Sequence, residues 1–121
     1  MSEVRDRGGT PAADHAALPA PLEPLRWHGS EPPDAEGVAR RLRAEGVVPS
    51  AWSNAPGDRY PEHSHGYVKL LICAAGSITF LVGSEHKAVE LHPGDGFILP
   101  AGTTHAAVVG PSGCTCLEGH R

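Results

Sequence analysis

The feature that most restricts the fold of this chain is a series of short β-type runs that begins after residue 47. Glycine, proline and small polar residues interrupt the series at close spacing, and these residues favour turns. The predicted strands span residues 47–53, 67–74, 77–82, 87–91, 96–99, 105–109 and 114–118, and the predicted turns lie at 75–76, 83–84, 92–95, 100–102 and 110–113. Many short strands without intervening helices predict an all-β sandwich or barrel.

One helix is expected ahead of the strands. Residues 34–45 read DAEGVARRLRAE, in which the apolar residues at 35, 38, 39 and 42 form one stripe and the arginines lie elsewhere. Gly46 suits a helix stop. The segment is therefore predicted to be a short amphipathic helix, and the sheet that follows is the surface that its apolar face can cover.

The start of the chain has a different composition. Residues 1–33 are rich in alanine, proline, glycine and charge and have little hydrophobic periodicity, so we expect a mobile arm. Leu22, Leu25 and Trp27 are the exception, because three large apolar groups so close together could dock the end of the arm. The predicted organisation is an arm at 1–33 and one domain at 34–121, which is a usual size for a single domain.

The run YVKLLICAA at residues 67–75 is largely apolar on both of its alternating faces. In a small barrel one face of a strand looks inward, so the other face must be covered by the helix at 34–45 or by a second subunit. A homodimer is therefore expected.

Composition argues against several partners. The formal net charge is −4 and basic residues cluster only at 40, 41 and 43, so we expect no nucleic-acid partner. The chain contains neither the ~20 apolar residues of a membrane span nor a secretory signal. We therefore expect no membrane partner and a cytoplasmic location. An odd number of cysteines, three, predicts reduced thiols.

Three histidines stand out by their spacing. His63 and His65 are two residues apart in an extended segment, where alternate side chains project to the same side. His105 begins a later predicted strand, directly after a rigid turn. Two ligands from one strand and a third from a facing strand would give a barrel interior a metal site with open coordination positions.

The glycine and proline pattern around these histidines resembles the two sequence motifs of the cupin superfamily. The first motif is matched by Gly57, His63-Ser64-His65, position 69 and Gly76, and the second by Gly94, Pro100-Ala101-Gly102 and His105. The resemblance covers roughly the last seventy residues. It implies a cupin jelly-roll β-barrel that binds a divalent metal ion near its middle through His63, His65 and His105.

Two positions depart from the family pattern. Lys69 stands where the first motif usually carries a glutamate ligand, and Val109 stands where the second usually ends in asparagine. A protonated ammonium has no lone pair to donate to a cation. Lys69 could turn its head to solvent, could lie inside as a substrate anchor for an anionic molecule, or could act in a partly neutral form as an acid or base.

The functional hypothesis is a metal-binding cupin that coordinates a small, anionic or oxygen-rich molecule. Three-histidine centres without the glutamate resemble those of some thiol and diketone dioxygenases, which makes a dioxygenase-type oxidoreductase the first activity to test. A non-catalytic binding or sensing module and a purely structural ion are the alternatives. Imidazole ligands suit zinc, iron, nickel and copper alike, so the sequence leaves the metal open.

For several other residues a functional role is conceivable, but packing or solvent exposure is the favoured interpretation. Cys114 and Cys116 share a strand face with Glu118 and could form a second metal or redox site, although inert packing is favoured. Tyr67 and Cys73 share the strand parity of His65 and could line the cavity, although core filling is favoured. The remaining histidines, at 15, 28, 86, 92 and 120, are expected to be solvated.

Overall fold

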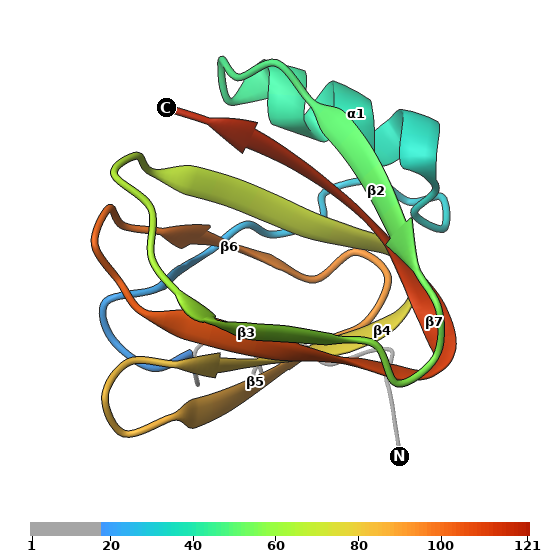
Figure 1. The fold of residues 1–121 in the computed structure, drawn as a ribbon. Helices are drawn as coiled ribbons and strands as arrows, with labels where there is room; N and C mark the ends of the chain where they lie inside the picture. Colours follow the sequence, from blue (N-terminus) through green and yellow to red (C-terminus); the bar gives the residue numbers. More distant parts are fainter. Residues whose placement is uncertain (1–17) are drawn as a thin grey trace.

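The computed structural model describes residues 18–121 and has an all-β fold with one helix (Figure 1). Its elements are β1 (Glu23–Pro24), α1 (Ala35–Ala44), β2 (Ser50–Asn54), β3 (Arg59–His63), β4 (Lys69–Val82), β5 (Lys87–Leu91), β6 (Gly96–Leu99) and β7 (His105–His120). The strands form one antiparallel sheet in the order β1-β6-β4-β7-β2, with β3 also paired to β7 and β5 to β4. The expected all-β architecture with a leading helix is confirmed.

The two longest strands, β4 and β7, run through both halves of the sheet, one half completed by β6 and β2 and the other by β5 and β3 (Figure 1). The first part of β4 pairs with β6 and the last part of β7 pairs with β2. The second part of β4 pairs with β5, and the first part of β7 pairs with β3. Because both long strands bend, the sheet folds over itself and encloses an interior between its halves.

The bend is located at a pair of glycines. The register of β4 against β7 shifts between Cys73 and Ala75 and again between Gly76 and Ile78. Gly76 has φ +71°, and a Cβ atom there would lie 2.0 Å from the carbonyl oxygen of Gly113. The prediction of separate strands at 67–74 and 77–82, and at 105–109 and 114–118, is wrong, because turn-type residues here form bulges inside continuous strands.

The sequence predicted an extended segment that carries both His63 and His65, but it did not predict the bounds of β3, which ends at His63 and leaves His65 outside the strand. Its residues, RYPEH, are half-buried or exposed and include a proline, so they carry no hydrophobic alternation. The strand exists because it pairs with the start of β7, with Arg59, Tyr60 and His63 opposite Val108, Ala107 and His105. Tertiary pairing has overridden a weak local signal.

The helix covers the outer face of β4, as expected. Asp34 caps its first turn by accepting a hydrogen bond from the Gly37 N–H at 2.7 Å. Val38 and Leu42 are fully buried in one cluster with Leu70 and Ile72 of β4. The helix thus covers the second apolar face of the 67–75 segment within one chain. That face therefore no longer argues for a second subunit, and the homodimer stays a prediction.

The end of the predicted arm packs on the sheet. Leu22 and Leu25 are buried, and β1 pairs with β6. The expected docking of this segment is confirmed, whereas residues 1–17, including His15, lie outside the described part of the chain. The mobility of the arm and the domain boundary at residue 33 stay predictions. The only helix in the described part, α1, is too short to cross a membrane.

Candidate metal centre and cavity

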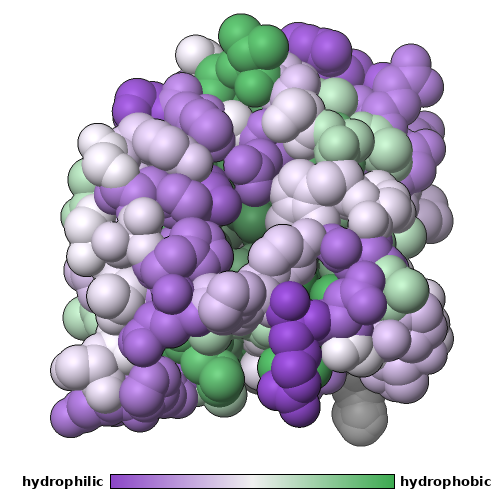
Figure 2. All heavy atoms as spheres, viewed as in Figure 1, coloured by the Kyte–Doolittle hydropathy of each residue, from purple (hydrophilic) through white to green (hydrophobic). Residues whose placement is uncertain are grey.

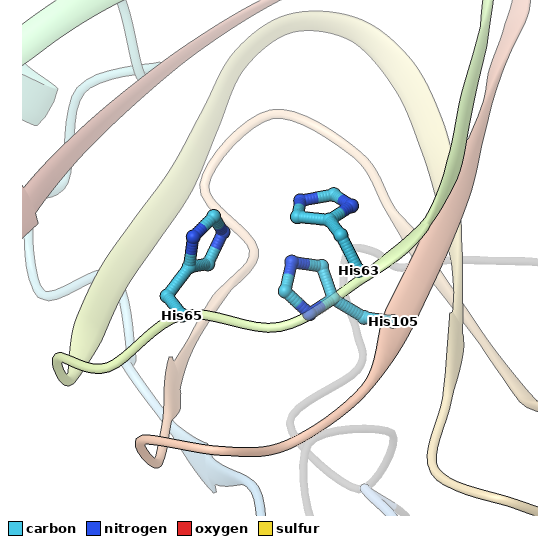
Figure 3. Close-up of side chains that lie close together, drawn as sticks. All are labelled: His63, His65 and His105. Atoms are coloured by element: carbon cyan, nitrogen blue, oxygen red, sulfur yellow. The ribbon is translucent and has the colours of Figure 1, made fainter.

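The side chains of the three candidate ligands lie close together (Figure 3). His63 ends β3 and His105 begins β7, and the two residues are direct Cα partners in the sheet. His65 follows in the loop after β3. The ring centroids are 4.3 Å apart for His63 and His105, 4.8 Å for His63 and His65, and 5.1 Å for His65 and His105. One nitrogen from each ring lies within 4.8 Å of the others, so the group could hold a metal ion.

Backbone hydrogen bonds to Nδ1 leave Nε2 available in two of the three rings, those of His63 and His105. Nδ1 of His63 lies 2.7 Å from the Pro61 carbonyl oxygen, and Nδ1 of His105 lies 3.0 Å from that of Thr103. A ring that donates from Nδ1 keeps the lone pair on Nε2 free for a cation. Within the described chain, the buried Nε2 atoms of His65 and His105 have no hydrogen-bond partner. Such orphaned polar atoms are costly, and a metal ion would satisfy both.

Electrostatics favour the neutral, ligating form of two rings. Burial lowers the pKa of His65, and the Lys69 ammonium and His63 lower it further. Burial also lowers the pKa of His105, although its hydrogen bond to the Thr103 carbonyl acts in the opposite direction. Both imidazoles are therefore neutral at pH 7, as metal binding requires.

A cavity of about 230 Å³ adjoins the histidines. The residues that line it are Trp52, Tyr60, His63, Lys69, Leu71, Phe80, His105, Ala107 and Glu118. Figure 2 shows apolar atoms in the depth of the viewed face, between more polar residues around them. Apolar walls with a few converging polar groups are typical of small-molecule sites.

Lys69 turns its ammonium inward. The residue is only 8% exposed and lines the cavity, so the alternative in which its head reaches solvent is wrong. Its Nζ lies 3.4 Å from Oε1 of Glu118. The same oxygen accepts a hydrogen bond from the indole Nε1 of Trp52 at 2.9 Å, and Nε2 of His120 lies 3.1 Å from Oε2.

The sequence singled out Glu118 only as a possible partner of Cys114 and Cys116 in a second site, and its contact with Lys69 was not predicted. Burial raises the pKa of its carboxyl, but the Lys69 ammonium and the hydrogen bonds from His120 and Trp52 outweigh burial and lower the pKa overall. The carboxylate is therefore ionised at pH 7 and balances Lys69. The sequence signal was the two-residue spacing that places Glu118 on one strand face with Cys114 and Cys116. The structure shows that both cysteines on this face are buried.

The remaining candidates divide between the site and the core. Tyr67 stacks on His65 at 4.8 Å and on His120 at 3.9 Å between ring centroids, so His120 is not simply solvated. The three cysteines are buried free thiols, and Cys73 is the direct partner of Cys116 in the sheet. All three belong to the inner apolar cluster, as the packing interpretation predicts.

The family model described as a cupin domain matches residues 52–117. A DMSP lyase, DddQ from Ruegeria pomeroyi, is 27% identical with a TM-score of 0.56 over 62% of this chain and 38% of its own. An RmlC-like cupin from Shewanella frigidimarina is 20% identical with a TM-score of 0.55 over 61% of this chain and 64% of its own.

A third similar structure is the polyketide cyclase RemF from Streptomyces resistomycificus, 24% identical with a TM-score of 0.56 over 61% of this chain and 53% of its own. The chain thus spans less than two thirds of each of these proteins. No curated protein sequence matches it.

Proposed function

Because this chain belongs to the cupin family, we propose that His63, His65 and His105 hold one divalent transition-metal ion beside a cavity for a small molecule. The observation that carries the proposal is the pair of buried Nε2 atoms, on His65 and His105, that lack a partner in the described chain, in rings whose ligand atoms lie within 4.8 Å of one another and of His63. Zinc, iron, nickel and copper all accept imidazole ligands.

The charge of the site favours an anionic or oxygen-rich ligand. Three neutral imidazoles leave the charge of a dication uncompensated, and Lys69 and Glu118 balance each other. A loaded cavity would therefore carry a net positive charge. A bound ion of this kind polarises an oxygen atom that coordinates it.

The cavity walls suggest how such a ligand would be oriented. Leu71, Phe80 and Ala107 offer apolar contacts to its body. Lys69 is the candidate substrate anchor. Its ammonium has three N–H donors, and the contact with Glu118 uses one of them, so the others can donate to a ligand. A ligand carboxylate or enolate between the ion and Lys69 would use both positive groups.

The first reaction class to test is a metal-dependent oxidation by dioxygen, which the resemblance to three-histidine dioxygenases supports. The likeness to the DMSP lyase, at 27% identity, favours a second candidate, a metal-assisted lyase reaction that needs no dioxygen. A non-catalytic binding or sensing module is the alternative from another class. We also propose a cytoplasmic location and a homodimeric state. Sedimentation at several protein concentrations tests the homodimer.

Elemental analysis of protein purified without a histidine tag tests the metal centre. One ion per chain is expected in the unsubstituted protein, and His105→Ala should lose it. A stoichiometry near zero after reconstitution with each of the four metals would overturn the proposal.

Turnover and binding assays then separate the classes. A dioxygenase requires dioxygen and a redox-active metal such as iron, whereas a lyase works without air. A sensor binds its molecule with any metal of suitable geometry and releases it unchanged. In either enzyme, Lys69→Ala should weaken substrate binding.

A further inference from the structure

Glu118 and His105 lie at opposite ends of β7, yet both line the same cavity. The carboxylate of Glu118 reaches Lys69 on the neighbouring strand β4, and it does so diagonally, because the direct partner of Glu118 in the sheet is Leu71. Lys69 in turn occupies the position where the cupin motif usually has a glutamate. The chain therefore keeps a carboxylate in the cavity wall but takes it from a different strand.

We propose that Glu118 is a positioning residue that sets the cation affinity of the histidine centre by neutralising the Lys69 ammonium. The inference rests on the proposed metal centre and assigns Glu118 no place among the ligands. The group that could hold an ion consists of His63, His65 and His105, and Glu118 does not belong to it.

The physical reason is charge repulsion in a partly dry cavity. An ammonium and a dication that share a wall repel each other, and the repulsion grows as water is excluded. Lys69 is 8% exposed, so solvent screens its charge weakly. A carboxylate 3.4 Å from the ammonium offsets part of the Lys69 field, as the opposite effects of Lys69 and Glu118 on the pKa of His65 indicate.

Both oxygens of Glu118 are held in place from other directions. The Trp52 indole on β2 donates to Oε1 at 2.9 Å, and His120 lies 3.1 Å from Oε2. The side chain of Glu118 is 15% exposed. These contacts hold the Glu118 carboxylate next to Lys69, so it does not coordinate the ion. Its effect on the ion is therefore electrostatic.

The test is a double-mutant cycle on cation affinity. Four untagged proteins are compared, namely the unsubstituted chain, Glu118→Gln, Lys69→Met and the double variant. Zn²⁺ affinity is measured by competition with a chromophoric chelator, and the visible absorption of bound Co²⁺ reports the ligand set. His92→Ala, which removes an exposed histidine, controls for adventitious binding.

The two single substitutions should change the Zn²⁺ affinity in opposite directions. Glu118→Gln should weaken Zn²⁺ binding about tenfold or more, since it leaves Lys69 unbalanced. Lys69→Met should tighten binding, and the double variant should return to within about threefold of the unsubstituted chain. The Co²⁺ spectrum of Glu118→Gln should keep its band positions, because the imidazole ligands are unchanged.

Two results would overturn this inference and leave the proposed metal centre standing. Equal affinities in all four proteins would show that the pair does not act on the ion, and a loss in both single variants would indicate a merely structural role. If Glu118→Gln does not fold, tighter binding in Lys69→Met with recovery in the double variant still decides the question. An unsubstituted chain that binds neither Zn²⁺ nor Co²⁺ would overturn the proposed metal centre, and this inference with it.

Discussion

His63 and His105 are direct Cα partners across strands β3 and β7, and their ring centroids lie 4.3 Å apart. The backbone pairing of two strands therefore sets the separation of two candidate ligands before any ion arrives. A preformed arrangement of this kind loses little side-chain freedom when it binds a cation.

The His105→Ala variant should lose the stabilisation that a metal ion confers. For the unsubstituted chain, metal at about 100 times its dissociation constant should raise the unfolding free energy by about 2.7 kcal/mol. Thermal unfolding with and without Zn²⁺ measures this gain. His92→Ala is the matched control and should keep the gain, because His92 is exposed and pairs with Glu90. A metal-induced shift that persists in His105→Ala would contradict the assignment.

Acid should weaken the contribution of Glu118 to stability. Burial raises the pKa of this carboxyl, but Lys69, His120 and Trp52 lower it by more, so the folded-state pKa lies below the unfolded-state value of about 4.3. The stabilisation is therefore complete above about pH 4.3 and is lost as the pH falls through the folded-state pKa. Urea unfolding of metal-free protein should show Glu118→Gln less stable than the unsubstituted chain by about 3 kcal/mol at pH 7, and by progressively less as the pH falls below about 4.3. A constant difference across this range would argue against an ionised pair.

Gly76→Ala should destabilise the fold more than an ordinary glycine substitution. The new Cβ would meet the Gly113 carbonyl oxygen at 2.0 Å, so the bend of β4 against β7 would have to move. We expect a loss of about 3 kcal/mol or more in chemical unfolding. Gly83→Ala is the matched control, since Gly83 also has a positive φ, +78°, but has open space around it, and it should cost about 1 kcal/mol. Similar losses for the two variants would mean that the bend tolerates a side chain.

Leu42→Ala tests whether the helix supports the sheet. Leu42 is fully buried against the outer face of β4, so its truncation should cost about 2–5 kcal/mol in unfolding free energy. Val48→Ala removes a side chain that is 86% exposed and should change stability by about 0.5 kcal/mol or less. If both variants unfold at the same denaturant concentration, the helix does not stabilise the domain.

The sequence predicted most of the candidate site because its signals are local or tied to a family pattern. The two-residue spacing of His63 and His65 and the turn before His105 carried enough information to bring the three rings together. The helix could be predicted for the same reason, since its apolar stripe and Gly46 lie within a few residues of each other.

The missing parts depend on contacts between distant residues. The residues at 75–76 have the same chemistry in a turn and in a bulge, and only pairing with β7 decides between them. Strand β3 has no hydrophobic pattern of its own and forms against β7. The inward position of Lys69 depends on Glu118, which no local pattern connects to it.

The glycine bend in β7 separates the polar wall of the cavity from the histidine end. Lys69 and Glu118 form one charge pair on two different strands, so a change at either position alone would leave an uncompensated charge in the cavity wall near the imidazoles.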